Sequence, residues 1–93
     1  MRRRQPTTNA VSLVYYSRTF HGGEWPRDYY PIAGVAASDL EDVFGLTTQG
    51  DHLCEDEIAL VSWLQPARSM MVGDVVENAA GFFRCLKSGW EKL

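Results

Sequence analysis

The sequence has no long apolar run. No stretch approaches the roughly 18 residues that a membrane span requires, and residues 1–5 are followed by polar residues rather than an apolar signal core. Cysteine is scarce too, because the chain has two, Cys54 and Cys85, which lie far apart. These absences predict a cytoplasmic protein without membrane contact, with reduced thiols in place of a disulfide framework.

Motifs that carry enzyme chemistry are also missing. The sequence has no G-x-S-x-G elbow, P-loop or dinucleotide fingerprint. His52 and Cys54 offer the atom types of a zinc site, but they form one loose pair where structural zinc sites usually have two. A small hydrolase that uses His21 or His52 stays open as an alternative, although nothing fixes a nucleophile beside its base. We expect no enzyme activity, no metal and no cofactor.

Basic residues are few in the body of the chain. Arg2, Arg3 and Arg4 provide three of the nine, which leaves six basic and twelve acidic residues and a net charge of −6. A surface of this sign repels phosphate backbones, so we do not expect the body to bind nucleic acid. Residues 1–9 have little to bury and are predicted to be a disordered basic tail.

The middle of the chain is strongly acidic. Seven acidic residues fall within a stretch that has no lysine or arginine: Asp39, Glu41, Asp42, Asp51, Glu55, Asp56 and Glu57. They are either a binding surface for a partner protein with a basic surface or ordinary solvated charges. Trp25 lies in the loop around residues 20–28, where we expect exposed aromatic side chains that contribute to binding, since tryptophan gives a large contact area. The alternative is that these aromatic side chains belong to the core.

Length and pattern predict one small α+β domain over residues 10–93. Runs rich in β-branched and aromatic residues predict strands at 10–16, 29–36 and 58–64, and turn residues divide the last third into a β-meander. Pro31 lacks a backbone donor, so it is expected either in an edge strand or at the start of a strand. The expected architecture is a small, twisted, mainly antiparallel sheet with one short helix.

The helix is predicted to begin at Ser38. Ser38 and Glu41 have the spacing of a capping box, in which each side chain accepts from the backbone N–H of the other. Gly45 favours an end near residue 45 or 46, and residues 47–57 are expected to form a loop. The buried face is expected to consist of three residues at helical spacing: Leu40, Val43 and Phe44.

The same residues carry a resemblance to a family. The segments 30–36, 39–47, 68–76, 83–85 and 89–90 resemble small uncharacterised prokaryotic proteins of plasmids, phages and other mobile elements, with the pattern LEDVF-x-LTN, RS-x-SVGDVV and a closing GW. The C-terminal part is similar to the YodL-type module. Thr48, Gln49 and Met71 depart from the pattern, which usually has Asn, His and Ser there. The resemblance implies a biological context and an agreeing fold, but no chemistry.

These observations lead to a hypothesis and an alternative. The hypothesis is a non-enzymatic interaction module of a mobile genetic element that binds a host protein, in its sharpest form an anti-CRISPR-like inhibitor of a nucleic-acid-targeting complex. An acidic surface suits a basic groove, because complementary charge speeds encounter. The alternative is a nucleic-acid-associated regulator in which residues 2–4 touch phosphate and the domain forms a homodimer.

Overall fold

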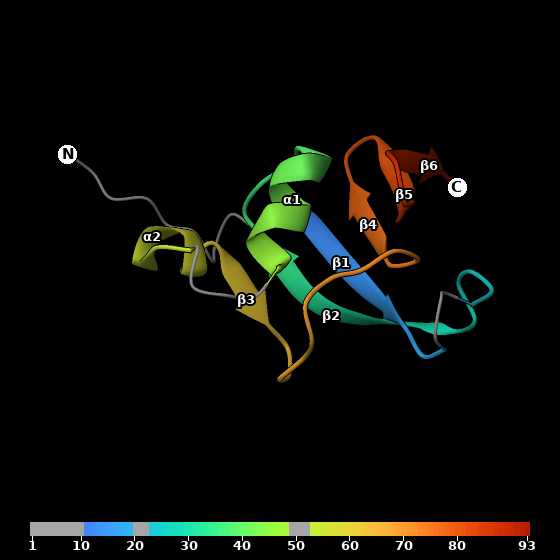
Figure 1. The fold of residues 1–93 in the computed structure, drawn as a ribbon, viewed down its shortest axis with the longest axis horizontal. Coiled ribbons are helices and arrows are strands. Elements are labelled where there is room, and N and C mark those ends of the chain that lie inside the picture. The colour runs from blue at the N-terminus through green and yellow to red at the C-terminus, as the bar shows by residue number, and fades with distance from the viewer. Residues whose placement is uncertain (1–10, 20–22, 49–52) are drawn as a thin grey trace.

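The computed structural model describes residues 11–19, 23–48 and 53–93, which form a small domain built mostly of sheet (Figure 1). Neighbouring strands are all antiparallel, in the order β3-β2-β1-β4-β5-β6. The antiparallel sheet and the C-terminal meander are therefore confirmed. The elements are β1 (Ser12–Ser17), β2 (Tyr29–Val35), α1 (Leu40–Thr47), α2 (Glu55–Ile58), β3 (Val61–Trp63), β4 (Val75–Asn78), β5 (Gly81–Cys85) and β6 (Trp90–Lys92).

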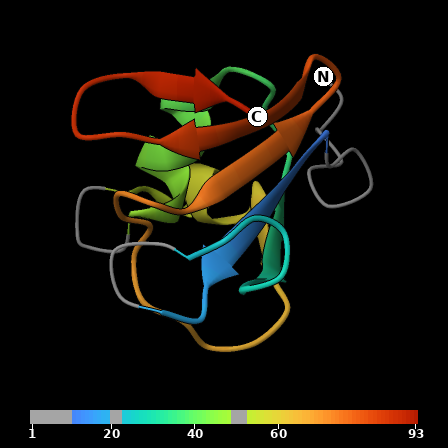
Figure 2. The ribbon, with the colours of Figure 1, turned by 90° about the vertical axis from the view of Figure 1, so that its right-hand side faces the viewer.

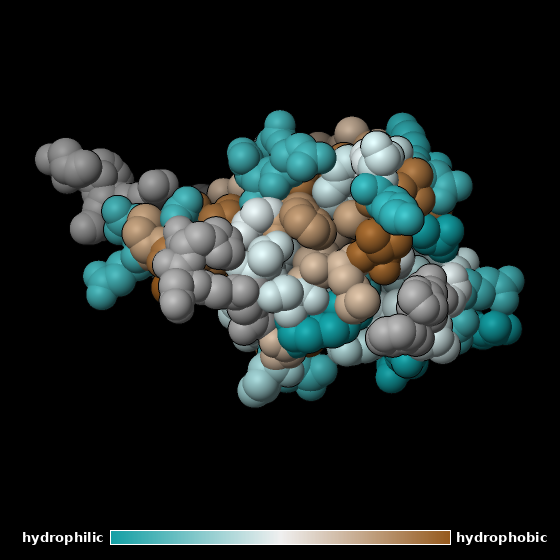
Figure 3. All heavy atoms as spheres, viewed as in Figure 1, coloured by the Kyte–Doolittle hydropathy of each residue, from teal (hydrophilic) through white to brown (hydrophobic). Residues whose placement is uncertain are grey.

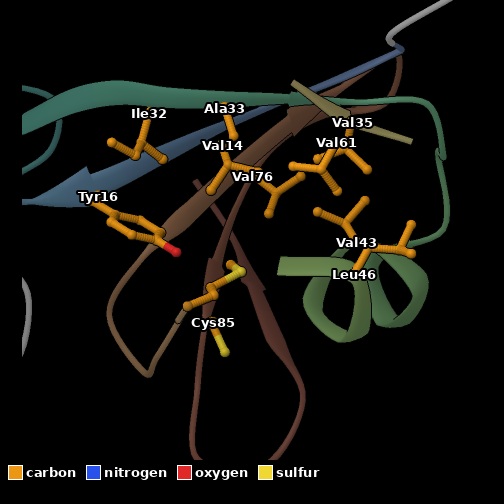
Figure 4. Close-up of a cluster of buried hydrophobic side chains, with 11 residues drawn as sticks. Val14, Tyr16, Ile32, Ala33, Val35, Val43, Leu46, Val61, Val76 and Cys85 are labelled. Atoms are coloured by element: carbon orange, nitrogen blue, oxygen red, sulfur yellow. The ribbon is translucent and has the colours of Figure 1, made fainter. Parts of the chain in front are cut away.

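The sheet curls around α1, which covers one of its faces. Figure 2 shows the strand direction turning progressively from β6 through β4 to β2, as the right-handed twist of strands requires. Val14 and Tyr16 point toward the helix side of the sheet (Figure 4). Because side chains alternate between the two faces along a strand, Tyr15 lies on the opposite face. The core between sheet and helix is built from buried residues of α1 and five strands (Figure 4): Val14, Tyr16, Ile32, Ala33, Val35, Val43, Leu46, Val61, Val76 and Cys85.

A β-bulge in β2 makes two consecutive residues face this core. Val14 pairs with Ala33 and Tyr15 pairs with Pro31, so Ile32 is an extra residue opposite the β1 register. Ile32 and Ala33 are both fully buried and point toward the helix side. Of the two alternatives for Pro31, the edge strand is wrong, because β2 lies between β3 and β1; Pro31 is the third residue of β2 and so lies near its start. The missing donor is tolerated since β3 pairs with residues 33–35 of β2 and ends before Pro31.

The N-cap of the helix lies one residue later than predicted, and the helix ends later than predicted. Asp39, not Ser38, is its N-cap, because the Asp39 carboxylate accepts from the backbone N–H groups of Glu41 and Asp42 at 2.9 and 3.3 Å. The helix continues through Gly45 to Thr47. The residues that it buries deeply are Val43, Leu46 and Thr47, whereas the predicted Leu40 and Phe44 are half-buried.

The segment predicted as a loop contains a second, one-turn helix, α2. The prediction of a single helix is therefore wrong, and the third strand is correspondingly shorter than the predicted 58–64. Glu57 accepts from the backbone N–H of Cys54 at 3.0 Å and caps this turn. Across the described part of the chain, no helix has the length and apolar character that crossing a membrane demands.

Candidate functional site

A cleft of about 530 Å³ lies between α1 and the segment that carries α2 and the start of β3. Its floor is mainly apolar, and its rim carries four of the seven acidic residues that the sequence singled out. Figure 3 shows hydrophilic side chains gathered over the start of α1 and beside α2. The residues that line the cleft are Ala36, Ala37, Ser38, Asp39, Glu41, Asp42, Gly45, Leu46, Leu53, Glu57 and Leu60.

The chain forms this cleft because β3 returns beside β2. Val35 pairs with Val61, and the backbone N–H of Ala36 donates to the carbonyl of Leu60 at 2.9 Å. The residues that lead into α1 therefore lie against the residues that leave α2. A second contact fixes the entry to α1, since the Ser12 hydroxyl donates to the carbonyl of Ala37. The cleft thus has backbone walls that are held by the sheet.

The three acidic residues at the start of α1 make different contacts. Asp39 caps the helix, as described above, and is exposed. Glu41 accepts a hydrogen bond of 3.0 Å from the indole N–H of Trp90, which ties α1 to β6. Asp42 is exposed on the rim, and its carboxylate has no hydrogen-bond or ion-pair partner in the described part of the chain. Asp42 is therefore the acid of the cleft that is most available to a ligand.

The acids of α2 divide between the cleft and the surface beside it. Glu57 lines the cleft while it caps α2. Glu55 and Asp56 are exposed and do not line the cleft. Asp51 lies outside the described residues. The structure therefore brings Asp39, Glu41, Asp42 and Glu57 together, with the two other described acids beside them.

Among the described residues, no positive side chain forms an ion pair with the acids on the α1 side of this cleft. The ion pairs between described residues are made by other carboxylates, those of Glu24, Asp28, Asp74 and Glu91. The positive end of the helix favours negative charge at all three acids; in addition, Asp39 accepts from backbone N–H groups and Glu41 accepts from the Trp90 indole. The cleft therefore combines negative charge with an apolar floor.

Trp25 does not join the acids. Its ring packs edge-on against Tyr15 and Tyr29, with ring centroids 5.1 Å apart in both pairs, and it lies 5.2 Å from Phe82. Tyr15 is on the face of the sheet opposite α1, so this aromatic cluster lies on the other side of the sheet from the cleft. Trp25 is half-buried there, and its contacts are those of a small second core.

The segment 68–76, which carries part of the family resemblance, is structural in this fold. Gly73 has a φ of 100°, a conformation that glycine adopts without strain, and it turns the chain so that Asp74 points inward. Arg68 pairs with Asp74, and the Tyr29 hydroxyl donates to the carbonyl of Gly73. These contacts join the segment to the sheet.

The described residues contain no cluster of metal-ligating side chains, and one of the two thiols, that of Cys85, is buried. No group of three metal-ligating side chains comes together among them, while His21 and His52 lie outside that part of the chain. Burial, with a further contribution from nearby Asp74, raises the pKa of the Cys85 thiol to about 11. Cys85 is therefore a protonated, apolar core residue at neutral pH.

Sequence reasoning missed the apolar floor of the cleft. Leu53 and Leu60 were not singled out, although they flank the acidic run 55–57 that contributes Glu57 to the rim. Apolar residues on both sides of a short acidic run are a signal that points to a half-buried helical turn. Models of protein families, curated proteins and solved structures contain no match to this chain.

Proposed function

We propose that this protein is a non-enzymatic interaction module that binds a basic segment of a partner protein in the cleft between α1 and α2. The observation that carries the proposal is the set of carboxylates of α1, which have no cation partner within the described residues and surround an apolar floor. A solvated acidic surface alone would have no such floor.

Lysine and arginine side chains fit this combination of charge and apolar surface. Their aliphatic stems cover apolar surface while their charged heads stay near water or a carboxylate. In the cleft, the stem would lie on Leu46, Leu53 and Leu60, and the head would reach Asp42 at the rim. The volume lies within the range of about 300–1,000 Å³ that is usual for ligand sites.

The kind of partner that we propose rests on the same charge argument. A negatively charged body is attracted to proteins whose working surface is a basic groove, among them complexes that hold nucleic acid, and it would compete with that nucleic acid. This supports the narrower proposal of an inhibitor from a mobile genetic element. The alternative of a nucleic-acid regulator rests on Arg2, Arg3 and Arg4, which lie outside the described residues.

The proposal is tested with a short capped peptide of alternating arginine and valine, and with the same peptide carrying glutamate in place of arginine. Asp42→Lys should weaken binding of the arginine peptide at least about tenfold, because it places a cation on the rim. Asp56→Lys is the matched control, since it changes the net charge equally at an exposed first-turn position outside the cleft. We expect it to weaken binding by less than about threefold.

Isothermal titration at low salt and near 0.15 M ionic strength measures these affinities. Equal losses in Asp42→Lys and Asp56→Lys would mean that overall charge, not the cleft, attracts the peptide. Equal affinity for the arginine and glutamate peptides would contradict the proposal outright. The partner itself is then sought by affinity capture with wild-type protein, with Asp42→Lys as the control bait.

A further inference from the structure

Within the part of the chain that the structure describes, the outer edge of β3 pairs with no further strand. β3 is the terminal strand of the sheet and pairs with β2 on one side. The Leu64 N–H donates to the carbonyl of Ile32 at 2.8 Å, and Leu60 accepts from Ala36. The Leu60 carbonyl and the backbone groups of Ser62 and Leu64 are therefore directed toward β2, while the Leu60 N–H donates to the carbonyl of Glu57 at 3.0 Å. By alternation, Val61 and Trp63 direct their N–H and carbonyl groups away from the sheet.

This edge lacks the protection found at the other end of the sheet. The opposite terminal strand, β6, carries Glu91 and Lys92, and charged residues at an edge discourage pairing with further strands. β3 reads Val-Ser-Trp and contains no charge. Ile58 and Leu64 flank it with 55% and 62% of their surface exposed. An uncharged edge with apolar neighbours is a template for an added strand.

The acidic residues near the edge of β3 favour binding of a basic segment. The cleft is lined by Leu60, the residue directly before Val61, and the acidic turn α2 precedes it. One end of an extended segment bound beside β3 would therefore lie close to the acidic residues of α2 and of the cleft. A second copy of this chain fits less well, because each body has an excess of negative charge and the two would repel.

We propose that the partner segment binds by strand addition: an extended, basic segment pairs with the outward backbone groups of Val61 and Trp63 and places a basic side chain in the cleft. This inference rests on the proposed function and specifies its binding mode. Backbone pairing supplies affinity that does not depend on side chains, while the cleft selects a lysine or arginine at one position.

The test uses the full chain and the arginine–valine peptide, together with the same peptide carrying N-methylated backbone amides. The methylated peptide keeps the side chains but lacks the N–H donors that a strand needs. We expect it to bind at least about tenfold more weakly. Amide hydrogen exchange followed by NMR should show Val61 and Trp63 slowed about tenfold or more by the unmethylated peptide, with Ser62 as the internal reference because its amide faces β2.

Three results would overturn the inference. Equal affinity of the two peptides, with no slowing at Val61 or Trp63, would mean that side chains alone hold the peptide; the proposed function would then stand without strand addition. Slow exchange of both amides in the peptide-free protein would mean that the edge is already occupied. Absence of binding by either peptide would remove both the inference and the proposed function.

Discussion

Arg68 and Asp74 face each other in a two-pronged ion pair, in which the two terminal guanidinium nitrogens donate to the two carboxylate oxygens at 2.8 and 3.0 Å. Asp74 is 1% exposed and also accepts from the backbone N–H groups of Ser17 and Met71. The guanidinium lies 4.1 Å from the ring centre of Tyr16, whose hydroxyl donates to the carbonyl of Arg68. One carboxylate thus joins β1 to the segment before β4.

Asp74→Asn should lower the free energy of unfolding by about 2–4 kcal/mol. The amide cannot accept all four hydrogen bonds, and it leaves Arg68 without its counter-charge. The matched control is Glu24→Gln, which removes a fully solvated pair with Arg27 and should cost at most about 1 kcal/mol. Urea denaturation measures both values, and equal effects would show that the Arg68–Asp74 pair is no more important than a surface contact.

Truncation of the α1 core residues should follow their burial. Leu46→Ala should cost about 2–5 kcal/mol, because Leu46 is 9% exposed and packs in the core. The loss for Phe44→Ala should be smaller, about 1–3 kcal/mol, since the ring is half-buried. If Phe44 were fully buried, as the sequence pattern predicts, its truncation would instead cost about 3–5 kcal/mol. A larger loss for Phe44→Ala than for Leu46→Ala, measured by denaturation, would contradict the observed orientation of α1.

Trp25→Ala separates stability from binding. The substitution removes three aromatic contacts and should lower the free energy of unfolding by about 1–3 kcal/mol. Affinity for the arginine–valine peptide should change by less than about twofold at a temperature where the variant is folded, because Trp25 lies on the other side of the sheet from the cleft. A clear loss of peptide affinity with unchanged stability would restore Trp25 to the binding surface.

The two thiols should differ in reactivity toward iodoacetamide. Cys54 is exposed, whereas Cys85 is buried with a raised pKa. We expect one cysteine to be alkylated quickly near pH 8 and the second to react after unfolding in denaturant. Peptide mass mapping identifies the sites, and Cys54→Ser serves as the control. Rapid modification of both thiols in the native protein would contradict the burial of Cys85.

Stability should fall as the pH rises from about 10 to 12. Burial, followed by the hydrogen bond to Glu77, raises the pKa of Tyr15 to about 12, and burial raises the pKa of Tyr16 further. The ordinary tyrosine pKa is about 10. A folded-state pKa above the unfolded value gives a contribution that is complete below pH 10 and is lost as the pH rises toward the folded value. Denaturation between pH 8 and 12 should show a shallower decline for Tyr15→Phe than for wild type, and identical slopes would contradict the assignment.

The sequence predicted the strands well because their local preferences agree with the fold. The β-branched pairs at 75–76 and the aromatic residues near 15 and 30 favour extended backbone, and the structure has β4, β1 and β2 there. The start of α1 was missed by one residue, because serine and aspartate are both good N-caps. Tertiary contacts decide between them: the Ser38 carbonyl accepts from the Asn78 side chain at 3.1 Å, and Asp39 is left to cap the helix.

The cleft could not be predicted from the sequence, for a different reason. The acidic residues themselves were identified, but their grouping depends on the pairing of β3 with β2, which brings residue 60 beside residue 36. Residues 36 and 60, which are far apart in the sequence, come into contact only through that register. The helical turn of α2 is likewise too short to be stable alone and depends on its surroundings. Long-range pairing thus decides which of several acidic residues share one site.

The bulge at Ile32 gives β2 a tolerance that a regular strand lacks. In a regular strand, removal of one residue moves every later side chain to the opposite face of the sheet. Here removal of Ile32 would leave the side chains of Tyr30 and Ala33 on the same faces of the sheet as in the present structure, because Ile32 is the extra residue of the bulge. The length of β2 can therefore change by one residue during evolution while the core residues of its second half stay on the core face. The pairing of β3 with β2 would then be kept.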